Sequence, residues 1–179
     1  LYTGDDKYKQ WDIDYIQAWM DRTEANGGLI PDNVGPTGKI GELMNGNWWG
    51  GYYGWRWPHG GWVMLEAMCN AGCNATLLTG DASWLDLFRS QADRLWEMRR
   101  EENGQVMIPN KHGAKGWFEF IPHASSQTLR LLMHAYAVGR KQEDMDRIEE
   151  QYGDRPLPDS KPLPGCGKAG SFTIHEWFE

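Results

Sequence analysis

Hydrophobic positions recur at helical spacing along most of the chain. The stretches that follow Asp5 and Asp81 carry apolar residues every three or four positions, and each aspartate stands where a helix needs an N-cap. Two further stretches, about 59–78 and 123–138, are apolar on most faces, which indicates inner helices that are covered on both sides. Another outer helix is predicted to begin near Gln142.

These helices belong to an internal repeat. The phrase Leu-Leu-Thr-Gly-Asp that begins at Leu77 matches the phrase Leu-Tyr-Thr-Gly-Asp that begins at Leu1. The segment 26–33 parallels 103–110 in a similar way. The outer helices carry corresponding apolar stripes, which comprise Tyr8, Trp11, Tyr15 and Trp19 in the first copy and Trp84, Leu87, Leu95 and Trp96 in the second.

The repeat predicts an all-α fold of tandem helical hairpins. Its units are about 1–76 and 77–138, with a third unit that begins near residue 142 and a Pro/Gly-rich loop over 154–170. One such unit cannot bury both faces of its inner helix, so several units must stack or close into a ring. The chain starts without Met and ends on an aromatic segment, so we interpret residues 1–179 as an incomplete domain. We expect the rest of the same polypeptide to pack against it as a partner.

The two complete copies differ in the loop before the inner helix. The segment from Pro31 to His59 is twice as long as the matching segment from Pro109 to His123. The longer segment is rich in glycine, and five of the 11 tryptophans lie between Trp48 and Trp62. Long loops on a helical scaffold often carry binding or catalytic residues. The alternative is that these rings form a small core of their own.

Composition and charge argue against several classes of function. The net charge of −7 argues against binding to a phosphate backbone, and we expect no nucleic-acid partner. A mean hydropathy of −0.67 and the lack of a long apolar run argue against membrane insertion. Three cysteines cannot form a closed disulfide framework, and Cys69 and Cys73 lack a further ligand at metal-site spacing. We therefore expect neither a metal site nor a cofactor.

The Leu-Thr-Gly-Asp phrases, the alternating helices and the loop Trp48–His59 together resemble the (α/α)6-toroid carbohydrate-active enzymes. These enzymes include glycoside hydrolases and polysaccharide lyases. The resemblance implies a six-hairpin toroid, a carbohydrate substrate and a secreted or periplasmic location. It carries over no catalytic residue.

The residues of the long loop favour a lyase. Cleavage by β-elimination beside a uronic acid needs a cation or amide against the carboxylate, and a tyrosine or histidine to move the C5 proton. Tyr52, Tyr53, Arg56 and His59 provide these groups within a short stretch of the loop. His59 is predicted to lie at a helix start, which would favour its neutral form. We expect an enzyme that cleaves an acidic poly- or oligosaccharide.

Two alternatives stay open. A glycoside hydrolase needs a pair of carboxylates, for which Asp32 and Glu42 are the candidates, and Asp32 stands where the second copy has Asn110. The other alternative is a non-catalytic module, which would either bind carbohydrate through the aromatic rings of the long loop or be a purely structural helical repeat. The residues predicted to bind substrate are Asn33, Asn47, Trp48, Trp49, Trp55, Trp57, His112, Trp117 and His123.

Overall fold

The computed structural model describes residues 4–56 and 58–153. Its elements are α1 (Asp6–Ala25), α2 (Trp62–Thr79), the 3-10 helix η1 (Ala82–Leu85), α3 (Asp86–Glu97), β1 (Arg100–Glu102), β2 (Gln105–Gly113), β3 (Gly116–Pro122), the 3-10 helix η2 (His123–Ser125), α4 (Thr128–Gly139) and α5 (Gln142–Tyr152). None of the helices described is long and apolar enough to cross a bilayer. The predicted loop over 154–170 lies outside the described residues.

The predicted all-α fold class is wrong, because residues 100–122 form a three-stranded antiparallel sheet in the order β1-β2-β3. Arg100 pairs with Met107, and Met107 also pairs with Pro122 across the other edge of β2. The turn between β1 and β2 is Asn103-Gly104, and both residues have positive φ. Asn-Gly is a favoured two-residue hairpin turn because both of its residues tolerate that conformation. The fold is therefore mixed, with five α-helices and one sheet in the part of the chain that the structure describes.

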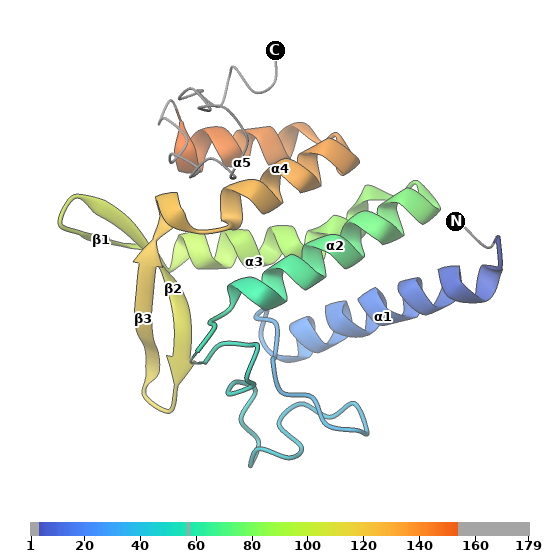
Figure 1. Ribbon diagram of the computed structural model, residues 1–179, viewed down its shortest axis with the longest axis horizontal. Helices are drawn as coiled ribbons and strands as arrows, with labels where there is room; N and C mark the ends of the chain where they lie inside the picture. Colours follow the sequence, from blue (N-terminus) through green and yellow to red (C-terminus); the bar gives the residue numbers. More distant parts are fainter. Residues whose placement is uncertain (1–3, 57, 154–179) are drawn as a thin grey trace, which may run out of the picture.

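The helices pack as two layers beside the sheet (Figure 1). The inner helices α2 and α4 lie side by side, and α3 and α5 lie behind them in that view. Both inner helices begin later than predicted, at Trp62 and Thr128. Residues 123–125 form a separate 3-10 turn, and Gly60, with φ of 78°, precedes the N-cap of α2.

Other local predictions are confirmed. The Asp5 side chain accepts a hydrogen bond from the Lys7 backbone N–H, and Asp81 does the same for Ser83. Helix α5 begins at Gln142. Counted from His59 and His123, Glu66 and Arg130 stand at matching positions of the two inner helices, which predicts an ion pair between them. This pair forms, with 2.9 Å between the Arg130 guanidinium and the Glu66 carboxylate, although both side chains are partly exposed.

A buried ion pair joins the outer helices α3 and α5. The Arg89 guanidinium donates to both carboxylate oxygens of Asp144, at 2.7 and 2.8 Å. The same guanidinium donates to the Ala82 carbonyl and to the exposed Asp86 carboxylate, both at 2.8 Å. Because both charged groups are removed from water, each needs the other as its partner. The ion pair therefore constrains how α3 packs against α5.

Candidate functional site

The long loop between α1 and α2 is organised around the carboxylate of Asp32. This carboxylate accepts hydrogen bonds from the backbone N–H groups of Gly50, Gly51 and Trp55. The approach is so close that a Cβ at Gly54 would lie 2.1 Å from the Asp32 side chain. Asp32 therefore shapes the loop from residue 50 to residue 55 and is not available as a free acid or base.

Trp55 anchors the loop in the core. Its side chain is fully buried, and its indole N–H donates to the Ile30 carbonyl at 2.7 Å. The Trp55 carbonyl accepts from the His112 backbone N–H on β2, and the indole ring meets the Trp117 ring edge-on at 5.2 Å. Trp55 was predicted to bind substrate, but its position makes it a core residue beyond the reach of a ligand.

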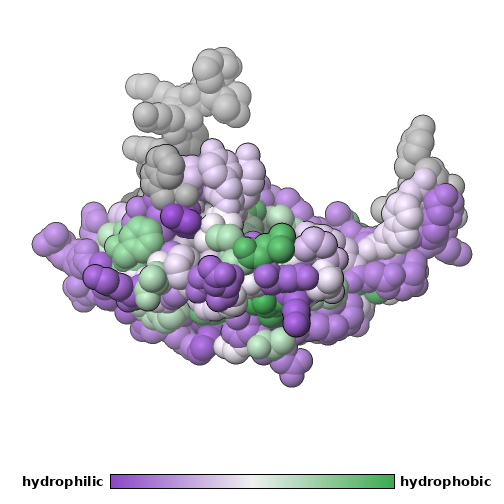
Figure 2. All heavy atoms as spheres, turned by 90° about the horizontal axis from the view of Figure 1, so that it is seen from below, coloured by the Kyte–Doolittle hydropathy of each residue, from purple (hydrophilic) through white to green (hydrophobic). Residues whose placement is uncertain are grey.

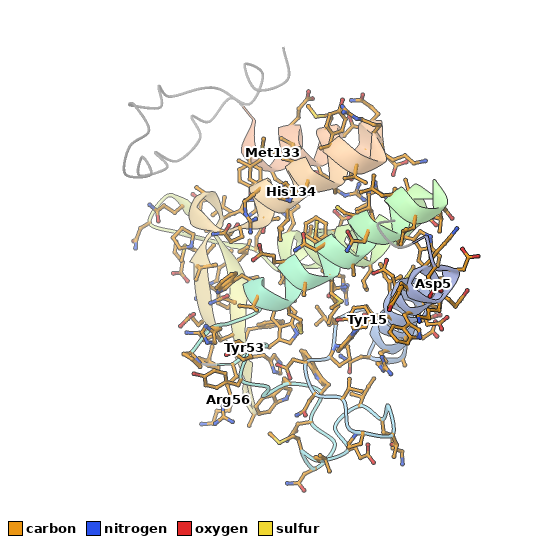
Figure 3. All side chains as sticks on the ribbon, turned by 45° about the vertical axis from the view of Figure 1, so that its right-hand side comes forward. Asp5, Tyr15, Tyr53, Arg56, Met133 and His134 are labelled. Atoms are coloured by element: carbon orange, nitrogen blue, oxygen red, sulfur yellow. The ribbon has the colours of Figure 1, made fainter. Side chains whose placement is uncertain are left out.

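Between these fixed points the loop presents a cluster of rings, which we call the tyrosine platform and define as Tyr52, Tyr53 and His59. Tyr52 is 60% exposed and Tyr53 is 62% exposed. The His59 ring stacks on Tyr53 at 5.0 Å with an interplanar angle of 17°, and it meets the edge of Tyr52 at 5.3 Å. Arg56 is exposed on the same loop, close to Tyr53 in Figure 3.

The surroundings of the platform are polar. Seen from below, the loop side of the molecule is mostly hydrophilic, and apolar residues form separate small patches (Figure 2). A broad apolar face would indicate a protein or membrane contact. Exposed aromatic rings set in a polar surface instead suit a ligand that has both hydroxyl groups and apolar C–H faces.

A second group of rings lies behind the loop, against the sheet. His112 on β2 lies between Trp48 at 4.8 Å, Trp49 at 5.5 Å and Trp117 at 5.0 Å, measured between ring centroids. All four side chains are half-buried. Burial lowers the pKa of His112, and the nearby Asp32 carboxylate partly offsets this shift. These predicted substrate-binding residues do come together, and they mainly support the loop.

We predict that His112 makes stability depend on pH. Its pKa in the folded protein is below the ordinary 6.5, so the unfolded chain binds more protons in this window. Stability is therefore lost as the pH falls from 6.5 through the folded pKa. Urea unfolding at several pH values should show this slope in the wild type and not in His112→Gln. The pKa of Asp32 is raised by burial, so Asp32 acts in the opposite sense at lower pH and is common to both proteins.

The predicted hydrolase carboxylates are both engaged by the loop itself. Glu42 accepts hydrogen bonds from the backbone N–H and the hydroxyl of Thr37, at 3.1 and 2.8 Å. Asp32 binds three backbone N–H groups, and neither carboxylate faces the tyrosine platform through a described contact. Both carboxylates therefore hold turns of the loop together, which accounts for their presence in the sequence.

The remaining predicted binding residues are scattered. Asn47 is exposed, and the Asn33 carbonyl accepts from the Gly41 N–H inside the loop. His123 does not join the rings of the long loop. It is buried against Tyr152 and Trp96, with ring centroids 4.4 Å and 4.9 Å away. It does not cap α4, which begins at Thr128. Trp57 lies outside the described residues.

Sequence reasoning singled out Asp32 but missed what it does. The difference between Asp32 and Asn110 in the repeat was the correct signal, since only a carboxylate offers two oxygens to three N–H donors. The glycines at positions 51 and 54 were the second signal, because a side chain at either position would collide with Asp32. Together these signals indicate that Asp32 holds the backbone of the loop through the N–H groups of Gly50, Gly51 and Trp55, an arrangement that we call the Asp32 clamp.

The comparisons with known proteins give one match. A family model described as a domain of unknown function, DUF8034, matches residues 1–108. No curated protein and no solved structure shows significant similarity to the chain. The predicted resemblance to the (α/α)6-toroid carbohydrate-active enzymes is therefore wrong, because the family is a different one and the second repeat contains a sheet.

Proposed function

The chain belongs to the DUF8034 family, a domain of unknown function, and we propose that it binds acidic carbohydrate through the tyrosine platform and Arg56. The observation that carries the proposal is the exposure of two tyrosine rings that are held in place by His59 and by the Asp32 clamp. A sugar ring stacks on such a surface through its C–H face. The rigid loop reduces the entropy that binding must overcome.

The preference for an acidic sugar rests on Arg56. No described residue forms a salt bridge with its guanidinium, and the side chain is exposed beside the platform. A guanidinium binds a carboxylate through two parallel N–H donors, which gives both affinity and orientation. A uronic acid offers the stacking face and the carboxylate in one residue, so it fits both parts of this surface.

Affinity electrophoresis in gels that contain polygalacturonate tests the proposal. Tyr53→Ala should weaken binding about 5-fold or more, since an aromatic contact contributes about 1 kcal/mol. Phe118→Ala is the matched control, because Phe118 is 59% exposed on β3 and points to the opposite side of that strand from Trp117. If Tyr53→Ala migrates like Phe118→Ala and the wild type, the platform is not the binding surface.

Cleavage by β-elimination is the second candidate. It is favoured by the contact of His59 with two tyrosines beside Arg56, which places possible proton carriers next to a possible carboxylate ligand. The reaction creates an unsaturated uronate that absorbs in the ultraviolet. An increase in absorbance with polygalacturonate, lost in His59→Ala, would establish a lyase, and binding without that increase would establish a binding module.

A further inference from the structure

A groove of about 530 Å³ lies between the outer helices α1 and α3. Both helices end on the same side of the molecule, α1 at the long loop and α3 at the sheet (Figure 1). Each helix presents to the groove residues that are three or four positions apart and so share one helix face. Neither the tyrosine platform nor Arg56 lines this groove, which is therefore a separate surface.

The walls of the groove carry an excess of negative charge. Arg94 is the one cation among the described residues that line it, against five carboxylates, which are Asp21, Glu24, Asp86, Asp93 and Glu97. Glu24 lies in the last turn of α1, and Glu97 is the last residue of α3. The carbonyl end of a helix carries a partial negative charge, so both helix dipoles favour a cation at this end of the groove.

The carboxylates on α1 are the ones that lack a counter-charge. Each of the three on α3 forms an ion pair with an arginine, which is Arg89, Arg94 or Arg147. Neither Asp21 nor Glu24 forms an ion pair with a described residue. Asp21 accepts a hydrogen bond from the neutral Gln17 amide at 2.7 Å. Both carboxylates are exposed and therefore open to a cationic ligand.

A buried hydroxyl on the same wall lacks a partner. Thr23 lines the groove and is 6% exposed. Its Oγ1 has no hydrogen-bond partner among the described residues. Nearly all buried polar groups in folded proteins are paired, because an unpaired one is costly. The N–H of an ammonium group in the groove would supply the missing donor, and this observation is independent of the carboxylates.

The shape of the groove suits an extended ligand. Met20, which is half-buried, and Leu87, which is buried, line it between the charged positions. The acidic row on α3 spans about 16 Å from Asp86 to Glu97. Among the described residues, no three His, Cys, Asp or Glu side chains gather as ligands for one metal ion. Carboxylates in rows beside apolar side chains match a chain of methylene groups that carries several separated charges.

We propose that this groove binds a linear polyamine, a chain of ammonium groups joined by short methylene segments. The ammonium groups contact Asp21, Glu24 and the Thr23 hydroxyl. The methylene segments lie over Met20 and Leu87. Because the carboxylates on α1 are exposed, salt weakens the binding.

Equilibrium dialysis of the full chain with labelled spermidine at about 0.15 M salt tests the proposal. The wild type should be half-saturated below about 1 mM, and the double variant Asp21→Asn with Glu24→Gln should bind at least 10-fold more weakly. The matched control is Asp146→Asn with Glu149→Gln on α5. These carboxylates are also exposed and three residues apart, and Asp146 also accepts from a glutamine one turn earlier. The control removes the same charge and should bind like the wild type.

Thr23→Val separates binding from a structural role. Valine keeps the shape of the side chain and removes an unpaired hydroxyl, so the stability in urea should be equal or higher. Spermidine should nevertheless bind about 2- to 5-fold more weakly, because one acceptor is lost. A loss of stability with unchanged binding would assign the hydroxyl to the fold and contradict its contact with the ligand.

Three results would overturn the proposal. Equal weakening in the two double variants would show only a general attraction to an acidic chain. Displacement of all spermidine by Mg²⁺ at equal ionic strength would show an exchangeable counterion. Tighter binding of tri-lysine than of spermidine would show that the groove fits a peptide. None of these results bears on sugar binding through Tyr53 and Arg56, which its own experiment tests.

Discussion

Replacement of Asp32 by alanine is expected to lower the free energy of unfolding by about 2–4 kcal/mol and to abolish sugar binding at the platform. The change leaves the backbone N–H groups of Gly50, Gly51 and Trp55 without the acceptor that closes the loop. Unpaired donors of this kind cost about 1–3 kcal/mol each where they stay buried. Because Tyr52 and Tyr53 lie between these donors, the platform loses its geometry along with its clamp.

Urea unfolding and affinity electrophoresis measure the two effects. Asp14→Ala is the matched control, because Asp14 is an exposed carboxylate whose described partner is Gln10, one helical turn away. Asp32→Asn should fall between the wild type and Asp32→Ala, since the amide keeps one acceptor oxygen. If Asp32→Ala proves as stable as Asp14→Ala, the clamp does not hold the loop.

The second large effect is expected at the ion pair between α3 and α5. Asp144→Asn should destabilise the protein by about 3–5 kcal/mol, because it leaves the buried Arg89 guanidinium without its main counter-charge. Asp86 binds the same guanidinium from an exposed position, so Asp86→Asn should cost less than about 1 kcal/mol.

Chemical denaturation followed by tryptophan fluorescence separates these variants. A double variant, Arg89→Met with Asp144→Leu, removes both charges and should recover most of the loss, since an apolar pair of similar size avoids the cost of desolvation. Equal losses in Asp144→Asn and Asp86→Asn would show that burial does not set the strength of this network.

The helices and their caps could be predicted from local sequence. The 3–4 spacing placed α1, α3 and α5, and Asp5 and Asp81 marked the starts of α1 and η1. The pair between Glu66 and Arg130 followed from matching positions in the repeat. These features depend on residues close in the chain or on a regular helix face, so periodicity captures them.

The sheet was missed because its strands lie inside the repeat. Helical periodicity on both sides made residues 100–122 look like the loop of another hairpin, whereas Asn103-Gly104 and the aromatic run Trp117–Ile121 favour strands. The pairing of β2 with β3 depends on contacts between residues on either side of a turn. The helical periodicity of the flanking segments carries no information about such contacts. The Asn-Gly turn was the signal to weigh more heavily.

The candidate site was predicted in its residue types but not in its roles. The excess of rings in the long loop correctly located Tyr52, Tyr53 and His59 together. Sequence alone gives no reason for Trp55 to be buried and Tyr53 exposed, because that depends on contacts with Ile30 and Trp117. For the same reason Asp32 looked catalytic, although its partners are backbone groups in a distant part of the loop.

Isothermal titration with tri-galacturonate and with its methyl ester tests the central claim most directly. The two ligands share one sugar shape and differ in charge, so their comparison isolates the contribution of Arg56. The wild type should bind the acid at least 10-fold more tightly than the ester, and Arg56→Gln should bind both alike, since a charged hydrogen bond contributes about 1.5–3 kcal/mol. Equal affinities in the wild type, or a preference for the acid that Arg56→Gln retains, would contradict acidic-sugar binding at the tyrosine platform.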